Sequence, residues 1–487
     1  MSIKQKAIKS VVWSAIQNWG TQAISLVVFF VLARVLQPED FGLVALANVF
    51  LAFMQIFLEQ GFAQALVQRE PLEPEHLDTA FWTNLGIGVI LTVLGVISAS
   101  FVADRFSEPE LTPILKCFSL LFIISALSKV QQAILERNFA FKAIAARWLL
   151  GTIIGGCVGV TMAVNGFGVW SLVAQQIFHE FVGTVVLWLS SDWRPKFRFS
   201  NSHFQQLFGF GINILGFNFL NFFNNRINDF LIGYFISPVA LGYYTIAYRV
   251  LRVMTQLLVK TTKDVSFPTF SRLQSDIERF QKAFYQATQL TSLVAFPCFL
   301  GMATLAPELV QLLFGEQWLP AIPLMQILAF MGILRSVSFF KSSVFLAMGK
   351  PSWWFWLSIL NAVSNFVAFA IAIPWGMMAV VSAYVIRGYL VFPVGQWAVS
   401  LLIKTPLLTY LGQFVAPLVS SLIMAIAILG TKQLLIPQLT PFLIIVVCSI
   451  LGIIVYGTGI RLFAPQLFNQ LLELTHLALS KPPQTKN

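Results

Sequence analysis

The sequence predicts an all-α polytopic membrane protein with about 14 transmembrane helices. Three observations support this prediction: a composition poor in charge, long apolar segments, and basic residues concentrated in alternate loops. Of the 487 residues, 57% are hydrophobic and only 10% are charged, whereas a soluble domain carries about a quarter charged residues. Such a chain cannot cover its surface in water, so lipid must be part of its solvent. The strands of a membrane β-barrel would alternate apolar and polar residues, and these long apolar runs do not.

The predicted spans are segments of about 20 apolar residues, the length that a helix needs to cross the hydrocarbon core. Their approximate limits, in chain order, are 9–32, 41–63, 80–102, 112–134, 143–164, 168–190, 206–228, 240–262, 284–305, 321–346, 353–373, 376–401, 409–430 and 440–462. In the fifth of these spans, Gly151, Gly155 and Gly159 repeat at four-residue spacing, which predicts a face for close helix packing.

The basic residues predict the orientation of the spans. Lys and Arg gather in the loops that face the cytoplasm if the N-terminus is also cytoplasmic, as the positive-inside rule requires. The sequence therefore predicts cytoplasmic N- and C-termini. The same asymmetry explains the net charge of +11, so we do not interpret this charge as a sign of nucleic-acid binding. Phe270, Ile277 and Phe284 share one face at helical spacing, which predicts an amphipathic helix on the inner surface over 270–284.

An internal repeat with an offset of 200 residues organises the spans. The first copy, ARVLQPEDFGLVALANVF, contains Pro38 and Gly42, and the second, GYFISPVALGYYTIAYRV, contains Pro238 and Gly242. Six spans separate the copies, so both enter the membrane from the same side and the halves form a parallel repeat. The predicted parts are an N-terminal lobe of six spans, a C-terminal lobe of six spans, two extra helices and a cytoplasmic tail, at residues 1–200, 201–403, 404–465 and 466–487.

Two polar faces lie at equivalent positions of the repeat, on the first and seventh spans. Side chains of this kind often form hydrogen bonds between helices, and a pair of such faces also suits the wall of a cavity between two lobes. Amide groups there can donate to and accept from sugar hydroxyls. The candidate sugar-binding residues are Asn18, Asn218, Asn221 and Asn225.

A ladder of basic residues follows one face of the eighth span, and further cations lie in the tenth and twelfth. A cation at mid-bilayer costs at least about 2.5–3.5 kcal/mol and needs water or a partner, although Lys260 can reach the inner interface by snorkelling. The excess of cations indicates an anionic substrate, and guanidinium groups favour phosphate. The candidate binding residues are Arg249, Arg252, Gln256, Lys260, Arg335 and Arg387.

Acidic and imidazole groups within the predicted spans are candidates for coupling transport to an ion. His179 and Glu180 lie side by side in the sixth span, where they form either a proton relay or, more commonly, a buried structural pair. The candidate coupling residues are Glu59, His179, Glu180 and Asp229.

The sequence predicts a transporter rather than an enzyme, with no cofactor and no metal. It contains no phosphate-binding loop, HExxH, GxSxG or dinucleotide-binding motif. Its four cysteines are scattered singly in apolar segments, without the spacing of disulfides or metal ligands.

Several motifs resemble those of the polysaccharide transporter family, which includes lipopolysaccharide and O-antigen flippases and belongs to the multidrug/oligosaccharidyl-lipid/polysaccharide (MOP) exporter superfamily. These are ARVLQPEDFGLVALA at 33–47, ILERNFAFKAIA at 134–145, GFGVWSLVAQQ at 166–176 and SPVALGYYTIAYRV at 237–250. The resemblance implies two six-helix lobes, a V-shaped cavity and two extra helices.

The resemblance also implies a function: a flippase that moves undecaprenyl-pyrophosphate-linked oligosaccharides across the bacterial inner membrane by alternating access, for O-antigen, capsule or exopolysaccharide synthesis. Members of the family work with a polysaccharide polymerase and export machinery. Two alternatives stay open at this point. One is a cation-coupled multidrug exporter of the same superfamily, which would need an acidic cavity. The other is a membrane O-antigen polymerase or ligase, which would need a large periplasmic loop.

Overall fold

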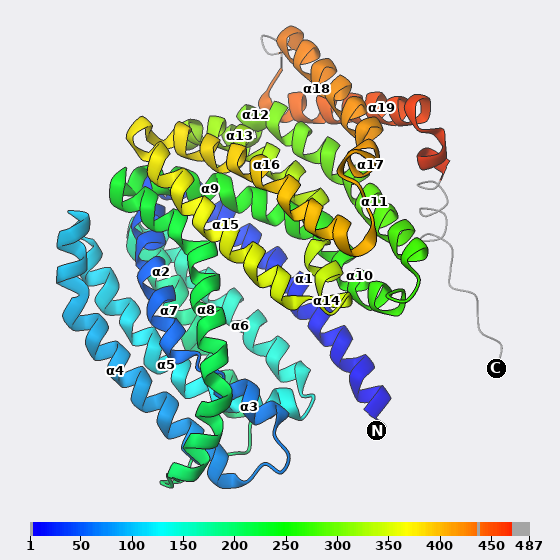
Figure 1. The fold of residues 1–487 in the computed structure, drawn as a ribbon. Coiled ribbons are helices and arrows are strands. Elements are labelled where there is room, and N and C mark those ends of the chain that lie inside the picture. The colour runs from blue at the N-terminus through cyan, green and yellow to red at the C-terminus, as the bar shows by residue number, and fades with distance from the viewer. Residues whose placement is uncertain (1–2, 436–438, 470–487) are drawn as a thin grey trace. The chain divides into compact units, whose positions relative to one another are not determined.

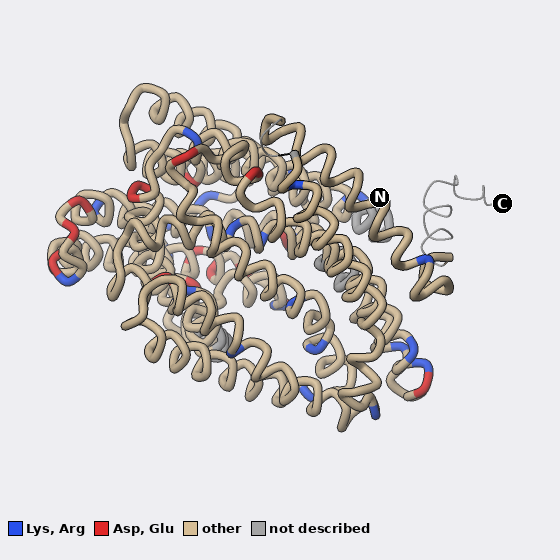
Figure 2. The backbone as a smooth tube through the Cα atoms, turned by 90° about the horizontal axis from the view of Figure 1, so that it is seen from above, with Lys and Arg blue, Asp and Glu red and all other residues tan. Residues whose placement is uncertain are grey.

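The computed structural model describes residues 3–435 and 439–469, without the side chains of 3–8, 209–215, 217, 259–265 and 435. The final part of the predicted tail, 470–487, lies outside this description. Every regular element in the described part is helical (Figure 1), so the predicted all-α class is confirmed. Figure 2 shows that most of the helix length carries no charged residue.

Eleven stretches among the described residues are long and apolar enough to cross a membrane. One of them, Pro351–Ile403, contains two long helices, and the helices Asn201–Phe235 and Pro238–Thr255 are not among the eleven. The predicted count of 14 spans therefore stays a prediction, while the membrane class follows directly from the length and hydropathy of the helices.

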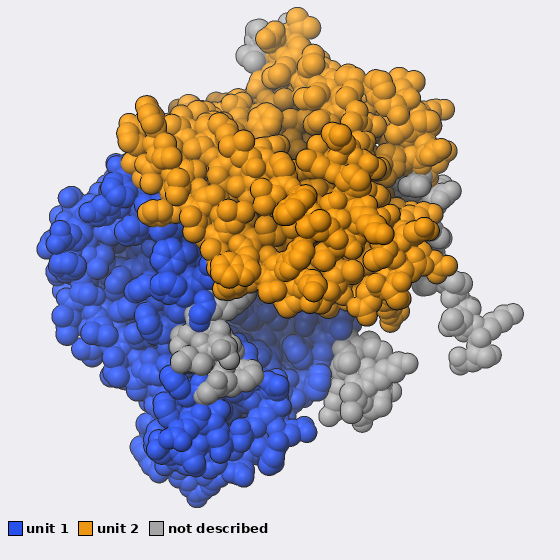
Figure 3. Space-filling model, viewed as in Figure 1, with its two compact units in different colours: residues 1–245 blue, residues 246–487 orange. Residues whose placement is uncertain are grey.

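Two compact units divide the chain, residues 1–245 and 246–487 (Figure 3). The first unit holds eight helices and the start of a ninth. They are α1 (Ile3–Val35), α2 (Pro38–Leu58), α3 (Phe62–Gln68), α4 (Pro74–Phe106), α5 (Leu111–Arg137), α6 (Phe141–Val164), α7 (Val169–Ser190), α8 (Asn201–Phe235) and α9 (Pro238–Thr255).

Within the first unit, α4 packs on α5, α6 packs on both α1 and α7, and α2 packs on α8. The glycine face of α6 allows its contact with α7 to be close. A β-carbon on Gly151 would lie 2.7 Å from the carbonyl oxygen of His179, and one on Gly155 would lie 2.6 Å from that of Gln175. This confirms the predicted packing role of the glycine repeat.

The second unit continues from α9 through a turn of π-helix, η1 (Gln256–Lys260). The elements that follow are α10 (Thr261–Arg272), α11 (Ile277–Thr304), α12 (Ala306–Leu313), η2 (Glu316–Ala321), α13 (Ile322–Ser338), α14 (Lys341–Ala347), α15 (Pro351–Ala372), η3 (Ile373–Trp375), α16 (Gly376–Ile403), α17 (Leu407–Gly412), α18 (Val415–Leu435) and α19 (Pro441–Phe463).

The extra helices α18 and α19 pack on each other and are attached to this unit by buried polar contacts. The Lys432 ammonium on α18 lies 2.8 Å from the Glu308 carboxylate on α12. The Tyr456 hydroxyl on α19 donates a 2.6 Å hydrogen bond to the carbonyl group of Leu293 on α11. The side chains of Lys432 and Glu308 are only 11% and 8% exposed, so this buried ion pair fixes α18 against α12.

The predicted surface helix over 270–284 is wrong. The chain turns between α10 and α11, where the Asp276 carboxylate caps α11 by accepting a 3.1 Å hydrogen bond from the backbone N–H of Arg279. Phe270 stacks on Phe280 across this turn, with ring centroids 5.0 Å apart, and both are fully buried. The apolar face therefore closes a helical hairpin instead of lying on lipid.

Candidate functional site

Arg335 forms the centre of a group of polar aromatic contacts in the second unit. Its Nη2 atom donates hydrogen bonds of 2.7 Å to the hydroxyl oxygens of both Tyr248 and Tyr384. The three residues come from α9, α13 and α16. The guanidinium group is thereby held between two helices that are distant in sequence.

Arg387 extends this group along α16. Its Nη1 and Nη2 atoms donate 2.9 Å hydrogen bonds to the side-chain oxygens of Asn361 and Asn365 on α15. The guanidinium carbon also lies 5.5 Å from the ring centre of Tyr384. The two asparagines are four residues apart, so they present both oxygens on one face of α15.

Arg252 completes the group from α9. Its guanidinium carbon lies 5.2 Å from the ring centre of Tyr248, while that of Arg335 lies 5.3 Å from the same ring. Arg252 is exposed. We call the set of Arg252, Tyr248, Arg335, Tyr384 and Arg387 the arginine–tyrosine cluster.

The arginine–tyrosine cluster is a concentration of positive charge without a carboxylate. Within the part of the chain that the structure describes, Arg252, Arg335 and Arg387 form no ion pair with an acidic side chain. Tyrosine hydroxyls, ring faces and amide oxygens stabilise the cations but do not neutralise them. A site of this kind in an apolar surrounding favours the binding of an anion.

The predicted basic ladder is interrupted after Arg252, because α9 does not continue past Thr255. The π-helical turn η1 changes the register of the residues that follow. Arg249 is half-buried on α9, and Gln256 is exposed at the first position of η1. The side chain of Lys260 lies outside the described residues.

A second polar network occupies the first unit. The Lys129 ammonium on α5 lies 3.0 Å from the carboxylate of Glu59, the residue that caps α2. The two residues line a polar cavity of about 720 Å³, counting its open mouth. Its other polar lining residues are Gln60, Gln64, Asn84, Gln132 and Glu136.

The predicted coupling pair on α7 is connected to this network. Arg147 on α6 lies 3.3 Å from the Glu180 carboxylate, and it also donates a hydrogen bond to Gln132. His179 lies 3.9 Å from Glu180. Arg147 is buried, with 9% of its side chain exposed, so Glu180 serves as its counter-ion. Asp229 instead lies 3.4 Å from Arg226, one turn earlier on α8.

The predicted sugar-binding asparagines of the first unit have different surroundings. Asn221 and Asn225 are exposed on α8, and the Nδ2 atom of Asn225 donates a 2.6 Å hydrogen bond to the Asn221 side-chain oxygen. Asn218 donates to the carbonyl group of Glu59 over 3.2 Å. Asn18 is exposed on α1.

Sequence reasoning missed the neutral half of the arginine–tyrosine cluster. It identified Arg252, Arg335 and Arg387 but not the tyrosines and asparagines that hold them. The four-residue spacing of Asn361 and Asn365 was a visible signal. Tyr248 and Tyr384 gave no such signal, because tyrosines are common at helix ends in membranes. Their partner Arg335 is 87 residues from Tyr248 and 49 residues from Tyr384 in the sequence.

Comparison with known proteins agrees with the fold and the motifs. The chain is 29% identical over 430 residues to the succinoglycan biosynthesis transport protein ExoT of Rhizobium meliloti, covering 86% of this chain and 85% of ExoT. It is 26% identical to the teichuronic acid biosynthesis protein TuaB of Bacillus subtilis, over 88% and 90% of the two chains.

A solved structure of the lipid II flippase MurJ, in an inward closed conformation, shares the fold. It superposes with a TM-score of 0.75 at 16% identity, over 94% of this chain and 99% of MurJ. The sequence profile of the family described as "Polysaccharide biosynthesis protein" matches residues 31–323. The family resemblance predicted from the motifs is confirmed, and the chain belongs to the polysaccharide biosynthesis protein family of membrane transporters.

Proposed function

We propose that this protein is a flippase that moves lipid-linked oligosaccharides across the membrane, and that the arginine–tyrosine cluster binds the diphosphate linking lipid and sugar. The observation that carries the proposal is the presence of Arg252, Arg335 and Arg387 in one cluster, with no acidic partner in the described part of the chain. The names of the relatives, which concern the export or synthesis of polysaccharides and a lipid II flippase, agree with it.

The chemistry of the cluster suits a diphosphate. A guanidinium group presents several N–H donors in a planar fork that matches two phosphate oxygens. The hydroxyl groups of Tyr248 and Tyr384 accept from Nη2 of Arg335 and so fix the orientation of this fork. A diphosphate ester carries a negative charge on each phosphate, so it supplies the counter-charge that the cluster lacks and lowers the cost of cations in the membrane.

The proposal assigns the remaining parts of the substrate and of the mechanism. The polyprenyl chain stays in lipid, and the sugars contact amides on α1 and α8, among them Asn18, Asn218, Asn221 and Asn225. Glu59, His179, Glu180 and Asp229 are the acidic and imidazole groups through which an ion gradient could drive alternating access. The protein lies in the bacterial inner membrane with both termini in the cytoplasm, and it delivers its substrate to a polysaccharide polymerase and export machinery.

The alternatives fit the cluster less well. A cation-coupled multidrug exporter needs an acidic site to attract cationic drugs, whereas this cluster is cationic. A polymerase or ligase needs a large loop for its reacting groups, whereas the longest connection between the described helices, which joins α7 to α8, runs only from Ser191 to Ser200. That segment is occupied by contacts to α4: Lys196 accepts from Trp82 and donates its backbone N–H to Asp78.

Complementation tests the proposal in cells. A bacterial strain lacking its own O-antigen or capsule flippase should recover surface polysaccharide when it expresses this protein. The double variant Arg335→Gln, Arg387→Gln should fail to restore it at equal protein level in the membrane. Arg279→Gln is the matched control, because Arg279 is 79% exposed and pairs with Asp276, the residue that caps its own helix. Full complementation by the double variant would refute the assignment of the diphosphate to the cluster.

A further inference from the structure

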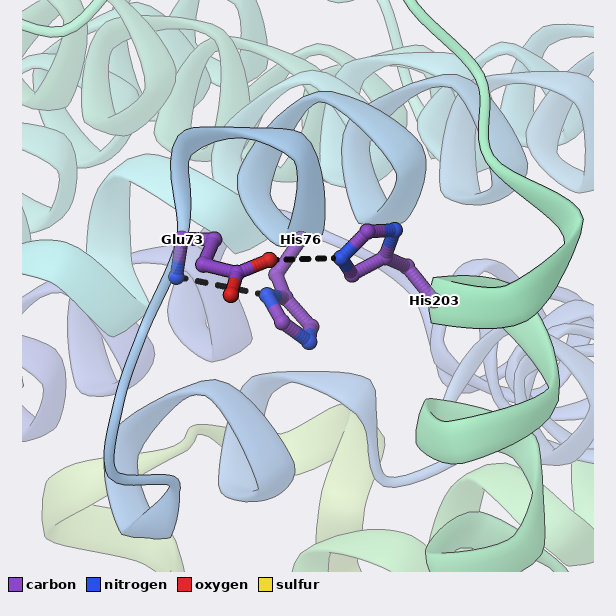
Figure 4. A group of neighbouring side chains, drawn as sticks. All are labelled: Glu73, His76 and His203. Atoms are coloured by element: carbon purple, nitrogen blue, oxygen red, sulfur yellow. Dashed lines mark hydrogen bonds and ion pairs between the residues drawn. The ribbon is translucent and has the colours of Figure 1, made fainter.

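Two histidines and a carboxylate from distant parts of the chain converge at one end of the first unit. Figure 4 shows Glu73 and His76 at the start of α4, facing His203 near the start of α8. One ligand atom from each of the three residues lies within 4.8 Å of the others. Glu73 and His203 are 130 residues apart in sequence, and their Oε2 and Nε2 atoms are 2.8 Å apart. We call these three residues the His–Glu cluster.

Each histidine uses its other ring nitrogen to contact a neutral oxygen outside the cluster. Nδ1 of His203 lies 2.6 Å from the hydroxyl oxygen of Ser200, and Nε2 of His76 lies 3.3 Å from the side-chain oxygen of Gln206. The rings meet edge to face with centroids 4.2 Å apart. Histidines that bind metals are almost always oriented by such an outer hydrogen bond. In the metal-free structure, Nδ1 of His76 accepts a 3.3 Å hydrogen bond from the backbone N–H of Glu73, and a metal ion at Nδ1 would replace this bond.

The contact between His203 and Glu73 requires a positive charge or a hydrogen at its centre. If Nδ1–H of His203 donates to Ser200, then Nε2 turns a lone pair toward the Glu73 carboxylate, and at 2.8 Å the two lone pairs repel. A proton on Nε2 relieves this repulsion, and so does a metal ion.

The donor set is that of a zinc site. Two imidazole nitrogens and one carboxylate leave a fourth position, as in three-ligand zinc centres. Bonds of about 2.0–2.2 Å place tetrahedral ligand atoms about 3.4 Å apart. Oε2 of Glu73 and Nε2 of His203, now 2.8 Å apart, would therefore separate by about 0.6 Å, and the more distant pairs, which lie within 4.8 Å, would close. His76 is 2% exposed and the side chain of Glu73 is 54% exposed, so the fourth position opens to solvent.

The geometry points to a binding site for Zn²⁺, or a similar divalent transition metal, on Glu73, His76 and His203. The bound ion would join the start of α4 to the start of α8, directly after the segment that leads from α7 into α8. That segment already contacts α4, because the backbone N–H of Ser200 donates to the Thr79 hydroxyl over 3.2 Å. Other charges near the site are those of Arg69, whose guanidinium group contacts Gln206, and of Glu75, which pairs with Arg198.

Zinc titration of the full-length protein, purified in detergent with its affinity tag removed, tests the inference. Calorimetry should show one high-affinity Zn²⁺ per chain, and bound Co²⁺ should give the visible absorption of a site of low coordination number. Glu73→Gln and His203→Gln should each weaken Zn²⁺ binding about tenfold or more. Glu75→Gln is the matched control, since this carboxylate is two residues away but belongs to the Arg198 pair, and it should leave binding unchanged.

The side chain of Glu73 is largely exposed, so its variant is expected to elute and melt like the wild-type protein without metal. Unchanged Zn²⁺ affinity in Glu73→Gln, or a wild-type protein that binds no Zn²⁺, would overturn the inference. Equal weakening by Glu75→Gln would also overturn it, because binding would then reflect general surface charge.

Discussion

Gly42 packs directly against the carbonyl group of Pro238, since a β-carbon on Gly42 would lie 1.8 Å from that oxygen. The relationship is reciprocal: a β-carbon on Gly242 would lie 1.9 Å from the carbonyl oxygen of Pro38. Both contacts lie inside the first unit. The two copies of the Pro-x-x-x-Gly motif, 200 residues apart, therefore face each other, and each glycine allows close approach of the opposite backbone.

Gly42→Ala is expected to destabilise the protein by about 1–3 kcal/mol, because the obstructing atom belongs to the backbone and cannot rotate away. Gly242→Ala should have a similar effect, as the contact is mirrored. Thermal unfolding in detergent, followed by tryptophan fluorescence, measures the difference. Gly86→Ala is the control, since nothing lies within 4 Å of a β-carbon there. Equal melting temperatures for all three variants would show that Gly42 and Gly242 do not pack closely against the opposite backbone.

Much of the fold followed from the sequence because apolar length and repeat symmetry are local or periodic signals. The repeat correctly predicted two equivalent helix junctions at Pro38 and Pro238. The π-helical turn at Gln256–Lys260 was not predictable, because no proline or glycine marks it. The break between α13 and α14, at Phe339 and Phe340, likewise has no local signal. Such interruptions are imposed by packing between helices.

Removing the hydroxyl groups around Arg335 should destabilise the protein. Tyr248→Phe and Tyr384→Phe each delete a hydrogen bond to a charged group, which contributes about 1.5–3 kcal/mol. Tyr389→Phe is the control: its hydroxyl donates to the neutral carbonyl group of Phe330, and a bond of that kind contributes about 0.5–1.5 kcal/mol. Chemical denaturation in mixed micelles provides the comparison. Tyrosine variants that are no less stable than the control would argue against a charged bond to Arg335.

Asn361→Asp tests whether the cluster needs an external anion. The new carboxylate would stand 2.9 Å from Arg387 and supply an internal counter-ion. We expect the variant to fold at least as stably as the wild type but to flip substrate about tenfold more slowly, because it neutralises the site and repels phosphate. Asn165→Asp, an exposed position at the end of α6, is the control for added charge and should leave flipping unchanged. Its stability is not compared, because the variant loses the hydrogen bond from Asn165 to the carbonyl group of Thr161. Normal flipping by Asn361→Asp would contradict an anion site at Arg387.

Glu180→Gln distinguishes a structural ion pair from a coupling residue. Breaking a buried pair costs about 3–5 kcal/mol when one charge is left without a partner. The partial exposure of Glu180, 25%, should reduce that cost. The exposed pair of Glu75 with Arg198 contributes about 0–1 kcal/mol, so Glu75→Gln is the comparison. A marked fall in melting temperature for Glu180→Gln alone supports the structural role. Loss of transport at unchanged stability would instead assign Glu180 to coupling.

The candidate site was predictable only in its charged half. Charges inside apolar spans are conspicuous in a sequence, so Arg252, Arg335 and Arg387 could be identified without coordinates. Their arrangement could not, because Arg335 meets Tyr248 and Tyr384 only through the packing of α9, α13 and α16. The His–Glu cluster was missed for the same reason: His203 joins Glu73 only after the chain has folded.

Flipping in proteoliposomes tests directly whether the arginine–tyrosine cluster binds the diphosphate during transport. A fluorescent oligosaccharide linked by diphosphate to a polyprenyl chain is incorporated, and its outer-leaflet fraction is read by chemical quenching over time. We predict that the protein equilibrates this lipid between leaflets, that Arg335→Gln, Arg387→Gln abolishes the exchange, and that Arg279→Gln retains it. Exchange at the wild-type rate in the double variant, or equal transport of a neutral lipid-linked oligosaccharide without the diphosphate, would show that the cluster does not bind the diphosphate during transport.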